Sequence, residues 1–292
     1  MKHLHEQFGS GWIPDYPDFR DYGEKHKEIS KMISKAGLKK SENKILPNRV
    51  DLRDWCPPIE NQGKLNSCTA HAGASLFEYF QKRAYGKHMD VSRLFLYKVT
   101  RKLLNWDADN GAFLRTTMGA MVLFGVPPEE YWPYKEKDVN KEPPPFCYAF
   151  AQNFQALKYL RLDPPNEPKE ASLRRIKSYL AAGFPSMFGF TMFNSLTQAL
   201  DSGEIPFPHE NDRKFGGHAL VAVGYDDSYR VKNWEDGGPE TMGAFLIRNS
   251  WGLNWGQRGY GWLPYYYVIK GLAVDWWSLI SSEWIDTGKF KL

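Results

Sequence analysis

The apolar and polar positions of the chain follow helical spacing most clearly just after Cys68. Apolar side chains recur at Ala72, Leu76 and Phe80, which is the spacing of one helical face, and Gly86 follows as a stop signal. The pattern predicts a buried helix that begins at Cys68 and ends before Gly86.

The same reading predicts two more helices, at 113–124 before Gly125 and at about 169–182 before Gly183. Between them, the proline-rich residues 127–146 are expected to form a loop. Short β-type runs, separated by Gly, Pro, Asp and Asn, then occupy 185–192, 218–225 and 244–250. Helices first and strands second predict an α+β fold with a helical half and a sheet half.

The N-terminal region has a different pattern. Residues 1–22 contain the segment GWIPDYPDFRDY, whose prolines disfavour helix in the residues before them, so an extended arm is expected. Residues 23–41 predict a short basic helix or, alternatively, a solvated arm. The apolar face of this helix would carry Ile29, Met32, Ile33 and Ala36. Residues 45–47 mark a boundary before the body of the chain begins at VDLRDW.

Composition narrows the class of protein. Of 292 residues, 42% are apolar and 25% charged, as in ordinary globular proteins. The net charge of +4 is too small to indicate nucleic-acid binding, and residues 24–44, with seven Lys against three Glu, account for all of it. The N-terminus lacks the apolar core of a Sec signal peptide, and no run of about 18 apolar residues occurs. We therefore expect no membrane span, and a location in the cytoplasm or export by a non-Sec route.

The three cysteines, Cys56, Cys68 and Cys147, are too few for a disulfide framework and have no metal-ligand spacing. The sequence leaves open whether Cys56 and Cys147 pair, and it implies no metal or organic cofactor. Cys68 is the candidate nucleophile. At the start of a helix, unpaired N–H groups and the helix dipole favour an anion and can lower a thiol pKa to roughly 3.5–7.5. The alternative is a small buried hydrophobic residue.

A catalytic thiol needs a base, and the base needs an orienting group. His218 follows Gly216 and Gly217 and opens an apolar strand, and Asn249 ends a second strand 31 residues later. A carboxamide at this position can fix the tautomer of the imidazole, and Trp251 can shield that hydrogen bond from water. Taken singly, a histidine at a strand start and an asparagine in a turn are more often structural.

Together these segments resemble the papain-like cysteine peptidases. VDLRDW with NQGxxxSC, then GGHALVAVGY, then NSWGxxWGxxGY match three signature blocks of that family in order, over about residues 46–270. The resemblance implies a two-lobed α+β fold with a cleft between a helical half, which carries the nucleophile helix, and an antiparallel β-sheet or barrel half. It also implies Cys68 as nucleophile, His218 as base, Asn249 as orienting group and Gln62 as a donor to the oxyanion.

The chain departs from the family pattern at several positions. The motif around the nucleophile carries Leu65 in place of a cysteine and Thr69 in place of an aromatic residue. Asn249 lies further from Cys68 than in the plant and lysosomal enzymes, and residues 226–243 are the candidate insertion. These departures are more similar to bacterial members. The residues expected to line the substrate cleft are Gly111, Ala112, Gly217, Ala219 and Trp251.

The resemblance predicts an endopeptidase that acts on a peptide or protein substrate as a monomer. The alternatives are a thiol-dependent amidase or acyltransferase, and a non-catalytic binding protein with the same fold. The expected division is an arm at 1–45, a helical lobe at about 46–165, a β lobe at about 166–275 and a tail at 276–292. Because the arm precedes the peptidase-like segment and carries aromatics and prolines, it is expected to cover the cleft as a short propeptide would. A targeting or secretion tail is the alternative.

Overall fold

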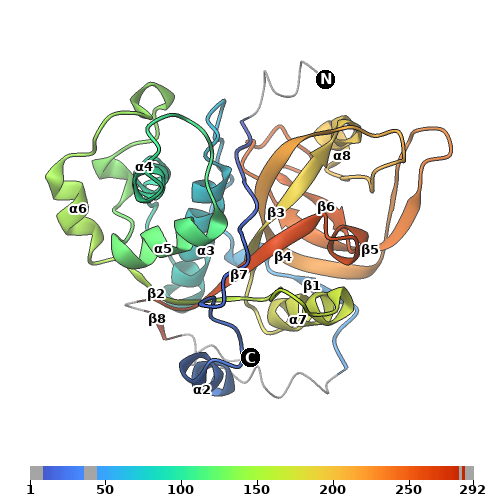
Figure 1. The fold of residues 1–292 in the computed structure, drawn as a ribbon, viewed down its shortest axis with the longest axis horizontal. Coiled ribbons are helices and arrows are strands. Elements are labelled where there is room, and N and C mark those ends of the chain that lie inside the picture. The colour runs from blue at the N-terminus through green and yellow to red at the C-terminus, as the bar shows by residue number, and fades with distance from the viewer. Residues whose placement is uncertain (1–8, 36–44, 283–284, 287–292) are drawn as a thin grey trace.

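The computed structural model describes residues 9–35, 45–282 and 285–286, and its helices and strands gather in two halves (Figure 1). The described helices are α2 Lys27–Lys35, α3 Cys68–Tyr85, α4 Arg93–Leu103, α5 Leu114–Leu123, α6 Pro145–Ala151, α7 Lys169–Ala181, α8 Ala199–Ser202 and α9 Tyr266–Ile269. The described strands are β1 Arg49–Asp51, β2 Ala156–Arg161, β3 Ser186–Phe193, β4 Lys214–Lys232, β5 Glu240–Arg248, β6 Tyr260–Pro264, β7 Ala273–Ser282 and β8 Ile285–Asp286. The predicted α+β fold with a helical half and an antiparallel sheet half is confirmed.

The helical half is built around α3, which contacts α4, α5 and the central strand β4 (Figure 1). One face of α3 is buried along most of its length, and the helix ends at Gly86, which has a φ of 74° that favours glycine. The helices predicted before Gly125 and Gly183 are present as α5 and α7.

Four of the described helices were not predicted, namely α4, α6, α8 and α9. The side chain of Ser92 caps α4 by accepting a hydrogen bond from the N–H of Phe95, a signal that the sequence contains. The prediction of a loop through residue 146 is wrong at its end, because α6 begins at Pro145. Proline is well tolerated in the first turn of a helix, where its missing N–H would have no helical partner.

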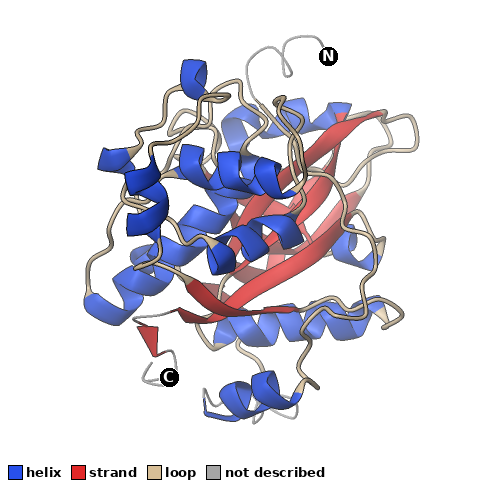
Figure 2. Cartoon of the chain, turned by 60° about the vertical axis from the view of Figure 1, so that its left-hand side comes forward, coloured by secondary structure: helices blue, strands red, loops and turns tan. Residues whose placement is uncertain are grey.

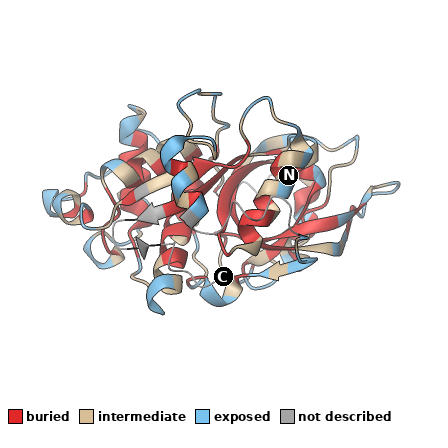
Figure 3. Ribbon diagram, turned by 90° about the horizontal axis from the view of Figure 1, so that it is seen from below, coloured by how far each residue is buried: buried red, intermediate tan, exposed pale blue. Residues whose placement is uncertain are grey.

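The sheet half pairs its strands antiparallel in the order β2–β7–β3–β4–β5–β6, with β1 on β4 and β8 on β7. Figure 2 shows the strands of this sheet in red, with helices around it in blue. The three predicted strands lie within β3, β4 and β5. The segment 226–243 forms the far end of the β4–β5 hairpin, where Arg230 pairs with Met242. Buried residues concentrate in the strands and in the helices packed on them (Figure 3).

Two strands of the sheet do not follow the expected division into lobes. β2 lies in the expected helical lobe yet pairs with β7, and the expected boundary between the β lobe and the tail at 276 falls inside β7. Neither β2 nor β7 was predicted from the sequence. The cysteines Cys56, Cys68 and Cys147 are all free and buried.

The N-terminal arm runs between the two halves, as the dark blue trace in Figure 1 shows. Within the described part of the predicted basic helix, Ile29 and Ile33 of α2 are buried and Met32 is partly buried against the body. The expected packing of this helix is therefore observed, while Ala36 lies outside the described residues.

Arg248 at the end of β5 ties the sheet to the segment before α3. Its buried guanidinium donates to the carbonyl of Pro57 at 2.7 Å, to the carbonyl of Pro58 and to the hydroxyl of Ser75 at 3.2 Å. We expect Arg248→Met to lower the free energy of unfolding by about 2–4 kcal/mol, because buried carbonyls would lose their donors.

The matched control is Arg230→Met in the β4–β5 hairpin. Arg230 is two-thirds exposed and pairs with Glu240 at 2.7 Å, so its loss should cost less than about 1 kcal/mol. Urea unfolding of both variants measures the difference. Equal losses would contradict the assigned role of Arg248.

Candidate active site

The thiol of Cys68 lies at the start of α3, as predicted, and is completely buried. Backbone N–H groups of Thr69, Ala219 and Trp12 face the sulfur and act to lower its pKa. Burial outweighs them and raises the pKa of Cys68 to about 12. The expectation of a lowered pKa is wrong for this state of the chain, because the sulfur has no contact with water.

His218 and Asn249 are brought together by the pairing of β4 with β5. The imidazole Nε2 lies 2.8 Å from the Asn249 carboxamide oxygen. Because that oxygen only accepts, Nε2 carries the proton and donates it, and Nδ1 is left as the basic nitrogen. Trp251 stacks on the imidazole with ring centroids 4.4 Å apart, so it covers the hydrogen bond as expected.

The imidazole is also withdrawn from water. Burial lowers the pKa of His218 to about 4, although the hydrogen bond with Asn249 acts in the opposite direction. His218 Nδ1 makes no hydrogen bond to any described residue. The thiol and the imidazole are therefore both neutral in this structure. The backbone N–H of Ala219, which faces the sulfur, belongs to the residue directly after His218.

The buried side chain of Gln62 is held in a fixed orientation. Ser250 donates its hydroxyl to the carboxamide oxygen at 2.6 Å, and the amide nitrogen donates to the carbonyl of Leu65 at 2.8 Å. The backbone N–H of Gln62 also bonds the carbonyl of Ser250 at 2.8 Å. The segment 249–251 thus orients both the histidine and the glutamine, a link that the sequence did not reveal.

The N-terminal arm fills the space in front of these residues. Its backbone donates from Gly11 and Trp12 to the carbonyl of Gly217, and it exchanges hydrogen bonds with Ala112 at 2.8 and 3.1 Å. The Trp251 indole donates to the carbonyl of Gly9 at 3.1 Å.

All five residues expected to line the cleft therefore meet the arm or the thiol. Gly111, with a φ of 83°, lies so close that a Cβ there would come 2.0 Å from the carbonyl oxygen of Gly11. Ala219 is the one that faces the sulfur.

The direction of the arm determines which atoms it presents to the thiol. Trp12 and Ala112 form a parallel bridge, and the N–H of Trp12 donates to the carbonyl of Gly217 at 3.3 Å while lying close enough to the Cys68 sulfur to act on its pKa. A thiolate attacks a carbonyl carbon, so an N–H at this position offers it nothing to attack.

A cluster of charged side chains anchors the arm, and sequence reasoning missed it. Asp15 Oδ2 accepts from the N–H of Arg115 and from the Trp277 indole, and Asp21 bonds the Arg115 guanidinium at 2.6 Å. Arg161 bridges Asp21 and Asp275. The partners of the arm lie about a hundred residues or more away, so no local pattern marks them.

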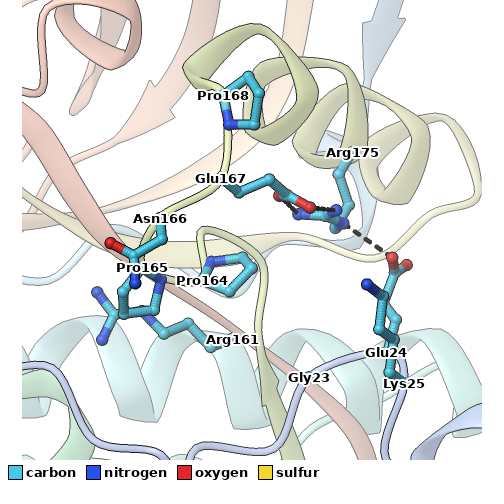
Figure 4. Close-up of a pocket in the computed structure, with 10 residues that line it drawn as sticks. All are labelled: Gly23, Glu24, Lys25, Arg161, Pro164, Pro165, Asn166, Glu167, Pro168 and Arg175. Atoms are coloured by element: carbon cyan, nitrogen blue, oxygen red, sulfur yellow. Dashed lines mark hydrogen bonds and ion pairs between the residues drawn. The ribbon is translucent and has the colours of Figure 1, made fainter.

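A hollow beside the arm is lined by residues 23–25 and 164–168 with Arg161 and Arg175 (Figure 4). Arg175 lies between Glu167 and Glu24, and its Nε bonds Glu24 at 2.8 Å. Since these charges are paired with one another, the hollow acts as a further anchor of the arm.

Within the described ranges, no His, Cys, Asp and Glu side chains cluster in a way that could hold a metal ion. The helices described here are also too short or too polar to cross a membrane.

Comparison with known proteins gives matches over most of the chain. The family model described as "Papain family cysteine protease" matches residues 46–266. An "uncharacterized peptidase C1-like protein" of Acanthamoeba polyphaga mimivirus is 31% identical over 282 residues, which cover 91% of this chain and 85% of the relative.

Solved structures agree with this result. Xylellain, a cysteine protease from Xylella fastidiosa, superposes with a TM-score of 0.74 at 32% identity, covering 94% of this chain and 96% of that one. Digestive procathepsin L 3 of Tenebrio molitor has a TM-score of 0.61 at 16% identity, covering 81% and 71%, and supports the fold alone. The resemblance to a bacterial member therefore extends over nearly the whole chain.

The covered thiol should resist alkylation until the arm is loosened. Trp12 is 5% exposed, and Trp12→Ala removes a buried contact of about 3–5 kcal/mol. Water then reaches the sulfur, its pKa falls, and we expect iodoacetamide at pH 7.5 to label Cys68 at least ~10-fold faster. Mass spectrometry of the labelled peptide measures the rate at this cysteine alone.

Phe19→Ala is the matched control, because Phe19 is an arm aromatic that is 98% exposed. Its labelling rate should equal that of the unmodified chain. Equal rates in all three proteins would show that the arm does not shield the thiol.

Proposed function

The chain belongs to the papain family of cysteine proteases, and from that premise we propose that it is an endopeptidase held inactive by its own N-terminal arm. The observation that carries the proposal is the convergence of Cys68, His218 with Asn249, and Gln62 on the space that the arm fills. Family membership makes the protein a hydrolase, while the residue roles below are our assignment.

In the proposed reaction, His218 Nδ1 takes the proton of the Cys68 thiol, and the thiolate attacks the carbonyl carbon of a peptide bond. The oxygen that becomes negative is stabilised by the backbone N–H of Cys68 and by an N–H of the Gln62 carboxamide. His218 then gives its proton to the leaving amine, which departs and leaves a thioester. Water hydrolyses the thioester with His218 as base and regenerates the thiol.

Each supporting group has a part in this scheme. Asn249 accepts from Nε2 and thereby keeps Nδ1 free to receive the proton. Ser250 donates to the oxygen of the Gln62 carboxamide, and so fixes the direction in which the carboxamide nitrogen points. The thiolate and imidazolium form only after the arm leaves, since water and substrate then solvate the pair.

Arm release is expected to depend on pH through the anchoring cluster. The cluster contains two guanidiniums, those of Arg115 and Arg161, and four carboxylates, those of Asp15, Asp21, Asp163 and Asp275. Burial raises the pKa of Asp15. Burial also raises the pKa of Asp275, to about 7, and repulsion from Asp15 adds to that shift. The phenol of Tyr159 faces the same cluster. Docking the arm therefore takes up protons.

The first prediction tests the residue roles in the full chain with Trp12→Ala, which opens the cleft. Adding Cys68→Ala should abolish hydrolysis of a fluorogenic peptide, whereas Cys147→Ala, a second buried free cysteine, should keep it. Gln62→Ala should lower kcat by about 10²–10³-fold, as expected when one oxyanion donor is lost. Substantial turnover without the Cys68 sulfur would show that Cys68 is not the nucleophile. Labelling of Cys68 by an epoxide inactivator with no peptide turnover would instead favour an amidase or acyltransferase.

The second prediction concerns pH. A carboxyl whose pKa is raised on docking favours the docked arm at low pH, and that contribution is lost as pH rises through about 7. The measurement is the rate of peptide hydrolysis by the Trp12→Ala chain divided by the rate of the unmodified chain. This ratio cancels the pH profile of the catalytic pair, which both proteins share. We expect this ratio to be at least ~10 at pH 5 and to approach one near pH 9.

Asp15→Asn should flatten this dependence, because it removes one carboxylate from the cluster. Asp18→Asn is the control: Asp18 belongs to the same arm but pairs with Arg20 on the surface. A ratio that grows between pH 5 and pH 9 would contradict proton-linked docking.

A further inference from the structure

The indole of Trp12 occupies a flat slot in the sheet half, close to the thiol. Its walls are Gly189 of β3 and Gly217 of β4. A Cβ on Gly189 would come 1.9 Å from the ring, and one on Gly217 would come 2.6 Å from it. The slot therefore exists because two strands lack side chains at these positions, and it belongs to the body of the protein.

The slot ends at the carboxylate of Asp275. Its Oδ2 accepts from the Trp12 indole N–H at 3.2 Å and from the N–H of Asp15 at 2.8 Å. Groups of the body fix its position: Arg161 bonds Oδ1 at 2.8 Å, and Asp163 accepts the Asp275 N–H at 2.9 Å. Asp275 also has a φ of 59°, a conformation that aspartate tolerates better than most residues. The carboxylate is thus held toward the slot by residues outside the arm.

Departure of the arm removes both donors from Asp275 Oδ2 at once. With the arm docked Asp275 is 1% exposed, so a side chain that refills the slot buries this oxygen again, and a buried acceptor without a donor is costly. Arg161 still bonds the other oxygen of Asp275. The vacated slot therefore lacks two things: a hydrogen-bond donor at its closed end and a flat apolar group against the glycines.

We infer that this slot selects the substrate: it takes a flat aromatic side chain with an N–H at its far edge, so the enzyme favours peptides with tryptophan near the cleaved bond. Asp275 is then a specificity-determining residue. The inference rests on the proposed function, since only a peptidase would place a substrate where the arm now lies. The arm and the substrate compete for the same two walls and the same carboxylate.

Other side chains satisfy the slot less well. Phenylalanine fits between the glycines but leaves Asp275 Oδ2 without a donor. Arginine supplies donors, but its guanidinium would lie beside that of Arg161, which bonds the other oxygen of Asp275 at 2.8 Å, and the two like charges would repel each other. The donor, and not the charge, decides the preference.

The test uses the full chain with Trp12→Ala and short fluorogenic peptides that differ only in one residue, Trp, Phe, Leu or Arg. That residue is placed first or second before the cleaved bond. We expect kcat/KM for Trp to exceed that for Phe by about 10–100-fold at one of these positions, the worth of one hydrogen bond to a charged group. Adding Asp275→Asn should reduce the ratio to below ~3, because the one amide oxygen stays with Arg161 and an NH₂ then faces the indole.

A second measurement does not depend on turnover. N-acetyltryptophanamide should enter the vacated slot of the Trp12→Ala chain and slow the alkylation of Cys68, while N-acetylphenylalaninamide should protect it less. Asp275→Asn should abolish the difference between the two compounds. Asp236→Asn, an exposed aspartate in the β4–β5 hairpin, should preserve it.

Peptides cleaved without a tryptophan preference, or with arginine preferred, would overturn the inference and leave the proposed function standing. A chain that cleaves none of the peptides would refute the proposed function, and with it this inference. Equal protection by the two amides would overturn the assignment of Asp275 by itself.

Discussion

Burial of the Cys68 sulfur beneath the backbone of Trp12 is the constraint on which the remaining features of the site depend. A helix N-terminus and three backbone N–H groups favour the thiolate, yet burial raises the pKa of the thiol to about 12. The same exclusion of water lowers the pKa of His218 to about 4. Two groups suited to form an ion pair are therefore both neutral while the arm is docked. Desolvation dominates here because the charged forms lose far more hydration than the local dipoles return.

The central strand β4 concentrates the functional groups in three consecutive residues. Gly217 supplies a carbonyl to the arm, His218 supplies the imidazole, and the N–H of Ala219 faces the thiol. Pairing with β3 and β5 on either side fixes the register of these groups. Successive residues of a strand point to opposite faces, so backbone and side chain can serve different partners at one place.

Attachment of the arm combines two different kinds of contact. The backbone of residues 9–13 uses hydrogen bonds that any peptide could make, and the Trp12 indole fills a slot between two glycines. The acidic residues that follow bind arginines of β2 and α5 instead, in a cluster where carboxylates outnumber guanidiniums. Asp275 takes part in both, because its carboxylate meets the indole as well as the arm backbone.

By itself the sequence determined the helix that begins at Cys68, the three strands that carry or flank His218 and Asn249, and the extended arm. These features are local: helical spacing, glycine stops and short β-type runs are written in neighbouring residues. It also determined the family, because three separate motifs occur in the right order, and with it the candidate roles of Gln62 and the cleft residues. Only the tertiary structure decided that β2 and β7 complete the sheet, that Ser250 orients Gln62 and that Trp12 enters a slot ending at Asp275. These contacts join residues up to 263 positions apart, and their effect on the thiol comes from excluding water, which depends on what lies over a residue in space.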